Sequence, residues 1–266
     1  MSLIRANRGF TLIEVAVVVL VITLLIGSLL VPLASQVEQR KVSDTQKALD
    51  EVREALIGFA MSNGRLPCPD NNGDGLEDAR TGADAAGDGC AGGVYAGTLP
   101  WATLGVSQTD AWGNRFKYRV TNEFTRRTGD ATAVAPCAPA GPDPNSCTLE
   151  LTDAGNLQVN TRDPATKAPI AVAQLVPAVV ISFGKNGYGA TSGDGVAQPA
   201  PPAANNDEIA NATAVTTTFF NRPMSTPSGA CSDSVAGQPF CEFDDVVVWV
   251  PTGILFNRMV AAGKLP

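Results

Sequence analysis

The stretch that decides the fold begins Arg8-Gly9-Phe10-Thr11-Leu12-Ile13-Glu14 and continues VAVVVLVITLLIGSLLVPLASQV to Val37. The 23 residues between Glu14 and Glu38 carry no charge and as an α-helix would span about 34 Å. That length matches the apolar core of a bilayer. Arg5 and Arg8 precede the run, and positive flanking charge keeps that end cytoplasmic. Residues 10–34 are therefore predicted to cross a membrane once.

The helical pattern continues beyond this apolar run. Apolar side chains recur at spacings of three and four among charged ones, at Leu49, Val52, Leu56 and Phe59. Such spacing predicts an amphipathic helix with one buried stripe. Gly64 and Pro67 then supply a stop. We expect one helix from about residue 10 to about residue 62, transmembrane over 10–34 and amphipathic over 35–62.

The remainder, residues 65–266, has the composition of a β-rich head. Short runs rich in Val, Thr and aromatic residues predict strands at Phe116–Thr121, Thr148–Thr152, Leu157–Thr161, Ala178–Phe183 and Val246–Val250. Asp153–Asn156 would join two of them as a hairpin, and 189–237 would form a long surface loop. A short helix is expected over Gly253–Ala262. The predicted class is α+β, a long N-terminal helix packed on an antiparallel sheet with disulfide-stapled loops.

Composition excludes several classes of function. The net charge of −7 and the pI near 4.6 argue against a nucleic-acid partner, which needs clustered Lys and Arg. The chain has no histidine, which removes Ser-His-Asp and Cys-His catalysis. Paired carboxylates could still serve a hydrolase, but no spacing selects a pair. We expect no enzymatic activity.

Six cysteines favour disulfides in an oxidising compartment. They stand at Cys68, Cys90, Cys137, Cys147, Cys231 and Cys241, with no C-x-x-C pair to suggest a metal cluster. Closing short loops costs least entropy, which favours pairing of neighbours: Cys68–Cys90, Cys137–Cys147 and Cys231–Cys241. Six free buried thiols are the alternative.

The segment from Arg8 to Val15 resembles the prepilin cleavage and methylation motif of type IV pilins and of type II secretion pseudopilins. A short basic leader, residues 1–9, ends in Gly9, whose missing side chain allows a membrane peptidase to hold the backbone closely. The resemblance implies cleavage by prepilin peptidase between Gly9 and Phe10, then N-methylation of Phe10. A secretory signal or a plain anchor does not explain this string.

Glu14 is the unusual residue of the motif. A carboxylate just inside a membrane helix costs a few kcal/mol on insertion scales, so it is a candidate for function. The resemblance implies that Glu14 of one subunit pairs with the Phe10 amine of the next and sets their register. The alternative places Glu14 among lipid headgroups without a role.

The resemblance also implies a location and partners. The precursor would lie in the bacterial inner membrane, with its N-terminus cytoplasmic and its head periplasmic. It would then join other pilin or pseudopilin subunits in a periplasmic or cell-surface filament. A structural subunit is the leading hypothesis, and a minor or tip pilin acting as an adhesin is the alternative. Pilus, type II secretion and DNA uptake all remain open.

Two parts of the head carry further patterns. Asp110-Ala111-Trp112-Gly113-Asn114 is similar to the D-x-W-G-N turn of pseudopilins, which implies that Trp112 anchors the core. Asp70, Asn72 and Asp74 with Gly75 follow the opening of a calcium loop, and Asp78 would add a water-mediated ligand. The usual bidentate Glu is replaced by Thr81. A structural calcium ion and a plain polar turn are both open. A second acidic group, Asp194, Asp207 and Glu208, lies in the region where the resemblance implies that pseudopilin heads hold calcium, although its spacing is not diagnostic.

Overall fold

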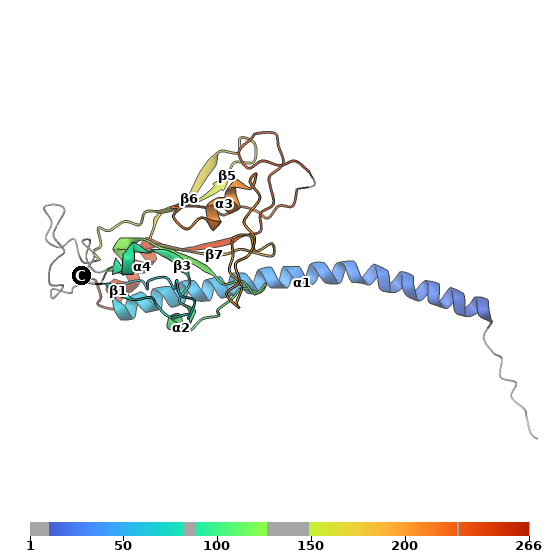
Figure 1. The fold of residues 1–266 in the computed structure, drawn as a ribbon, viewed down its shortest axis with the longest axis horizontal. Helices are drawn as coiled ribbons and strands as arrows, with labels where there is room; N and C mark the ends of the chain where they lie inside the picture. The colour runs from blue at the N-terminus through green and yellow to red at the C-terminus, as the bar shows by residue number, and fades with distance from the viewer. Residues whose placement is uncertain (1–10, 82–88, 127–148, 228, 266) are drawn as a thin grey trace, which may run out of the picture. The chain divides into compact units, whose positions relative to one another are not determined.

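The computed structural model describes residues 11–81, 89–126, 149–227 and 229–265, and every structural statement below refers to them (Figure 1). The chain divides into two compact units, Met1–Ser43 and Asp44–Pro266. The fold is α+β, as predicted, and the second unit contains the three sheets of the described residues and the folded core.

Helix α1, Leu12–Asn63, agrees closely with the helix expected over residues 10–62. It ends where predicted: Gly64 has a left-handed φ of 72° and donates its N–H to the carbonyl of Ala60. Glycine adopts this conformation without steric cost and commonly closes helices. Among the residues described, no helix is both long and apolar enough to cross a membrane.

The second half of α1 is part of the head core. Leu49, Val52 and Leu56 are completely buried, as their spacing predicts. Ile57 and Ala60 are buried too, whereas Phe59 is half-buried under the guanidinium of Arg65. The helical stripe thus belongs to the same apolar cluster as the sheet residues.

A four-stranded antiparallel sheet packs against α1. Its order is β3 (Ala96–Thr98), β4 (Lys117–Val120), β7 (Ala178–Ser182) and β9 (Val246–Val250). The side chains of β7 alternate between two apolar clusters: Ala178 and Val180 join α1, while Val179 and Ile181 face the other way. Burial on both faces explains why β7 reads as a continuous apolar run.

A second sheet covers the other face of β7. Its order is β6 (Pro169–Val176), β5 (Leu157–Arg162) and β8 (Thr218–Phe220), with β5 and β8 parallel. Figure 1 shows β5 and β6 across the four-stranded sheet from α1. The antiparallel prediction holds for the first sheet, for β5–β6 and for the short pair β1–β2, but not for β5–β8.

Short elements complete the fold. They are β1 (Arg80–Thr81), β2 (Gly89–Cys90), η1 (Ala91–Gly93), α2 (Trp101–Leu104), η2 (Asn122–Thr125), α3 (Asn206–Ala212) and α4 (Thr252–Ala261). Helix α4 matches the predicted C-terminal helix.

Three sequence-based expectations were wrong. Residues 149–152 form a turn and not a strand, so the hairpin through Asp153–Asn156 does not exist. Residues 189–237 are not one surface loop, because they contain α3 and β8, whose inner residues are buried. Trp112 is half-buried, and Phe116 and Tyr118 fill the core in its place.

Two disulfides join neighbouring cysteines, Cys68 to Cys90 and Cys231 to Cys241. These are two of the three pairs that the spacing favours. Cys137 and Cys147 lie outside the described residues, so their bridge stays a prediction. No described cysteine is free.

Candidate functional site

The N-terminal motif is described from Thr11 onward, and Gly9 and Phe10 lie outside the described residues. Glu14 stands in the first turn of α1 with an exposed side chain. The Thr11 N–H donates to Oε2 of Glu14 at 3.4 Å, and the Glu14 N–H donates to Oγ1 of Thr11 at 3.4 Å. This reciprocal pair is a capping box, which satisfies free N–H groups at a helix start.

The capping box gives Glu14 a local structural role that the sequence analysis missed. The T-x-x-E spacing preceding an apolar run was the available signal. In the described structure Glu14 therefore stabilises the beginning of α1. Whether its charge also pairs with a neighbouring subunit is a separate question, because capping needs only a hydrogen-bond acceptor.

The predicted calcium residues all lie in one loop, and each accepts a backbone hydrogen bond there. Buried Asp70 takes the N–H groups of Gly73 and Gly75 at 2.7 and 2.9 Å. Asn72 accepts from Asp74, Asp74 from Leu76, and Asp78 from Asn71. Such bonds shape a tight turn with or without an ion.

The carboxylates of this loop do not converge. In the part of the chain that the structure describes, Asp70, Asp74 and Asp78 do not form a group with mutual oxygen distances within 4.8 Å. The loop is held by Glu77, whose carboxylate binds Arg65 and accepts the Cys68 N–H at 2.8 Å. The structure thus brings the four residues into one turn, but the carboxylates of Asp70, Asp74 and Asp78 do not meet at a common point.

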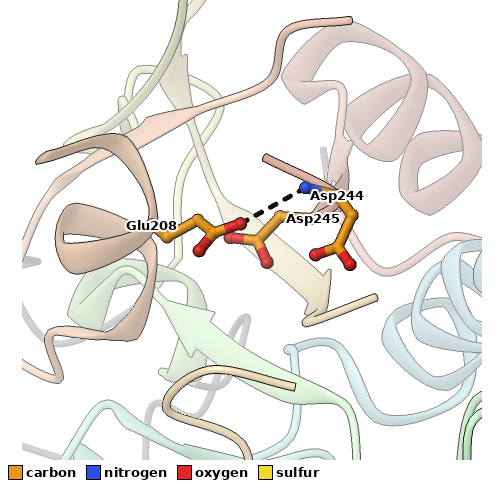
Figure 2. A group of neighbouring side chains, drawn as sticks. All are labelled: Glu208, Asp244 and Asp245. Atoms are coloured by element: carbon orange, nitrogen blue, oxygen red, sulfur yellow. Dashed lines mark hydrogen bonds between the residues drawn. The ribbon is translucent and has the colours of Figure 1, made fainter. Parts of the chain in front are cut away.

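A different group of acids does converge, from segments far apart in sequence. Glu208 of α3 and Asp244 and Asp245, which precede β9, each place a carboxylate oxygen within 4.8 Å of the others (Figure 2). Glu208 and Asp245 are 0% and 3% exposed. Gly184 permits this arrangement, because a Cβ there would lie 2.4 Å from the Asp244 carbonyl oxygen.

Amide groups hold the three acids in place. Glu208 accepts from the side chains of Asn186 and Asn205 at 2.9 and 2.7 Å, and from the Asp244 N–H at 3.3 Å. Asn211 donates to Oδ2 of Asp245 at 2.8 Å. These donors to Glu208 and Asp245 are neutral, so they orient the two carboxylates without cancelling their charge.

The neighbouring acid on α3 shows the opposite arrangement. Asp207 is also completely buried, but Arg162 and Arg222 each donate to it at 2.8 Å. Arg222 further binds Asp233 and the Cys241 carbonyl, next to the Cys231–Cys241 bridge. Two adjacent carboxylates on α3 therefore differ in kind: Asp207 is ion-paired, and Glu208 is surrounded by amides and acids.

Burial and mutual repulsion change the ionisation of this cluster. Burial, followed in smaller part by the charge of Asp244, raises the pKa of Glu208 to about 7. Burial and then Glu208 raise the pKa of Asp245 well above its usual value. Lys117 acts electrostatically on Asp245, and burial lowers the pKa of Lys117 to about 7 although Asp245 opposes that shift.

Two buried oxygens of the cluster lack a hydrogen-bond partner in the described structure: Oδ1 of Asp245 and Oδ1 of Asn205. An unsatisfied buried acceptor costs about 1–3 kcal/mol, and more when charged. Carboxylate and amide oxygens are the ligands that hard divalent cations prefer. The residues present therefore fit a calcium ion, which would supply the missing positive charge.

The sequence carried little signal for this cluster. Glu208 lies in the segment predicted as a loop, where it belongs to the second acidic group with Asp194 and Asp207, and Asp244-Asp245 directly precede the predicted strand Val246–Val250. Glu208 and Asp244 are 36 residues apart along the chain, so no local spacing links them.

Comparison with known proteins concerns the N-terminus. Residues 4–30 match the family model of the prokaryotic N-terminal methylation motif. No curated protein and no solved structure is significantly similar to the chain. With Glu14 at the beginning of α1, the match agrees with the predicted prepilin motif. The chain carries the N-terminal signature of the type IV pilin and pseudopilin family.

Proposed function

We propose that the chain is a structural subunit of a type IV pilus or type II secretion pseudopilus. The observation that carries this proposal is the methylation motif at residues 4–30 running directly into α1, Leu12–Asn63. Prepilin peptidase would cut between Gly9 and Phe10 and methylate Phe10. Residues 10–34 would hold the precursor in the inner membrane and then pack against other subunits. This role requires no catalytic residue.

Mass spectrometry of the protein from strains with and without prepilin peptidase tests this function. The expected wild-type N-terminus is methylated Phe10, and it should shift to an uncut chain without the peptidase. Gly9→Val should also remain uncut, because a branched side chain prevents close backbone approach. Gly27→Val, in the same apolar run, is the matched control and should be cut normally. An unprocessed wild-type chain would overturn the proposal.

A minor or tip subunit that binds a surface is the second candidate. It is favoured by the segment that contains α3 and β8, which is folded and braced by Cys231–Cys241. A folded segment of this kind presents a defined surface, which a binding module needs. Quantitative immunoblotting of purified filaments separates the two roles, since a major subunit is abundant and a tip subunit is rare.

We also propose that a structural calcium ion stabilises the head. The buried cluster of Glu208, Asp244 and Asp245 supports this more strongly than the loop Asp70–Asp78, because its carboxylates converge. Millimolar calcium should raise the melting temperature of the protein above its value in chelator, and this increase should saturate with calcium concentration. Asp245→Asn should abolish this increase in melting temperature, whereas Asp74→Ala should show the same increase as wild type. The reverse pattern would locate the ion in the loop, and no increment in wild type would exclude both sites.

A further inference from the structure

A cavity of about 320 Å³ lies in the head, apart from the acidic cluster of Figure 2. Its polar lining includes Asp70, Asn71, Thr98, Arg115, Lys117 and Thr191. The volume is at the lower end of the range for small-molecule sites, which is about 300–1,000 Å³. Phe183 and several small residues, among them Gly97 and Ala214, form the rest of the wall.

Two cations line the cavity side by side. Arg115 and Lys117 are two residues apart along the β4 segment, so their side chains leave the same face. Lys117 is only 9% exposed, and its ammonium donates to the carbonyls of Asn211 and Thr213 at 2.5 and 2.8 Å. Arg115 donates to the carbonyls of Gly73 and Gly193 at 3.2 and 2.9 Å.

The positive charge of the two side chains is compensated only in part: Arg115 lies over the Trp101 ring at 4.9 Å, and Asp245 acts on Lys117 without forming an ion pair with it. In the described parts of the chain, no carboxylate oxygen lies within 4.0 Å of a side-chain nitrogen of Arg115 or Lys117, which is the distance limit for an ion pair. The one carboxylate in the lining, that of Asp70, already accepts two loop N–H groups. A buried charge without a counter-ion is costly. An anion in the cavity would remove that cost.

We propose that this cavity binds a single carboxylate group, carried by a small molecule or by an acidic side chain of a partner polypeptide. An ammonium has three N–H donors and a guanidinium five. Lys117 uses two donors and Arg115 uses three, at Nε, Nη1 and Nη2. The remaining N–H groups match the lone pairs of one carboxylate, and charge-assisted bonds of this kind are strong.

A purely structural role for the two cations is the competing explanation. Arg115 connects the loops at Gly73 and Gly193, and Lys117 binds carbonyls at the end of α3. Cations at helix C-termini are stabilising on their own. This explanation predicts that substitution lowers stability but that wild-type protein binds no carboxylate, so binding by folded wild type decides between the two.

The experiment is calorimetric titration of the full-length chain in detergent with succinate and with N-acetyl-glutamate amide, a blocked acidic side chain. Saturable binding of at least one probe is expected, and dimethyl succinate, the uncharged analogue, should not bind. Tighter binding of the blocked glutamate assigns the ligand to a polypeptide, and tighter binding of succinate assigns it to a small molecule. Absence of binding by either probe up to about 10 mM would overturn the proposal.

Variants and a protection assay complete the test. Lys117→Met and Arg115→Gln should each weaken binding at least about tenfold, whereas exposed Lys185→Met should not. Because a cavity variant can fail to fold, the wild-type chain is also acetylated with a water-soluble active ester. The bound probe should slow modification of Lys117 and leave that of Lys185 unchanged. Equal modification of Lys117 with and without saturating probe, or undiminished binding by a folded Lys117→Met chain, would refute the site. This inference does not depend on filament assembly.

Discussion

Adjacent acids on α3 show how strongly the surroundings determine what a single side chain does. Asp207 and Glu208 are both fully buried, yet Arg162 and Arg222 pair with the first while only neutral donors reach the second. A buried carboxylate that lacks a counter-ion takes up a proton or binds a cation. Glu208 is therefore expected to respond both to pH and to a bound cation.

The first prediction follows from the raised pKa of Glu208. Its pKa is about 7 in the folded chain, against 4.5 for the unperturbed group. As pH rises, the unfolded chain loses the Glu208 proton near pH 4.5, whereas the folded chain keeps it until about pH 7. The stability that this group contributes below about pH 4.5 is therefore lost as pH rises through 7. In chelator, the free energy of unfolding should fall between pH 5 and pH 7, by up to about 3 kcal/mol from this group.

Denaturant titration at several pH values measures that fall. Glu208→Gln should flatten the dependence, because glutamine cannot ionise. Glu51→Gln, at an exposed position on α1, is the matched control and should leave it unchanged. Above pH 7 the free energy of unfolding should fall less steeply with pH, because the lowered pKa of Lys117 makes stability rise with pH there. Stability that is flat in wild type between pH 5 and pH 7 would contradict the prediction.

The second prediction separates the two roles of Glu14. Glutamine at this position can keep the capping box with Thr11 but carries no charge. Glu14→Gln should therefore insert and fold normally and yet give a low yield of filaments. Glu14→Leu should lose the bond from the Thr11 N–H to Oε2, which is one half of the capping box, and should also lose assembly.

Electron microscopy and immunoblotting of sheared filaments measure the yield for both variants. A wild-type yield from Glu14→Gln combined with a low yield from Glu14→Leu would mean that Glu14 acts as a helix cap alone. Normal yields from both would remove Glu14 from the assembly mechanism.

At the scale of elements, the second half of α1 acts as a core element of the head. Its buried stripe, with Leu56 completely enclosed, packs on the face of β7 that carries Ala178 and Val180. Leu56→Ala should lower the free energy of unfolding by about 2–5 kcal/mol, because it leaves a cavity in a close-packed core. Leu151→Ala is the control, since Leu151 is 46% exposed, and should change stability by about 0.5 kcal/mol or less. Equal losses from both would show that the stripe is not packed as described.

At the scale of the whole molecule, the described core sets the smallest unit that can fold. The compact unit begins at Asp44, inside α1, and not at the end of the helix. A fragment of residues 35–266 should unfold cooperatively, whereas residues 65–266 should not, since that fragment lacks Leu49, Val52 and Leu56. Thermal melts followed by circular dichroism test this. A cooperative melt from residues 65–266 would show that the sheets are stable without the helix.

Local features of the chain were predictable because nearby residues produce them. The helix over residues 12–63 follows from apolar spacing and from Gly64, and the strands β4, β5, β7 and β9 follow from their Val-rich runs. The disulfide partners Cys68 with Cys90 and Cys231 with Cys241 follow from short loops. In each case the free energy depends on contacts close in sequence.

By itself, then, the sequence determined the N-terminal motif, the long helix and the α+β class. Only the tertiary structure decided the second sheet, with β8 parallel to β5, and the cluster that joins Glu208 to Asp244 and Asp245. The physical reason is that the contacts which stabilise these features join residues far apart in the sequence. Short strands and a seven-residue helix such as α3 have weak local preferences and exist because distant partners bury them. A charged site built from segments that meet only in the folded core leaves no spacing in the chain to read.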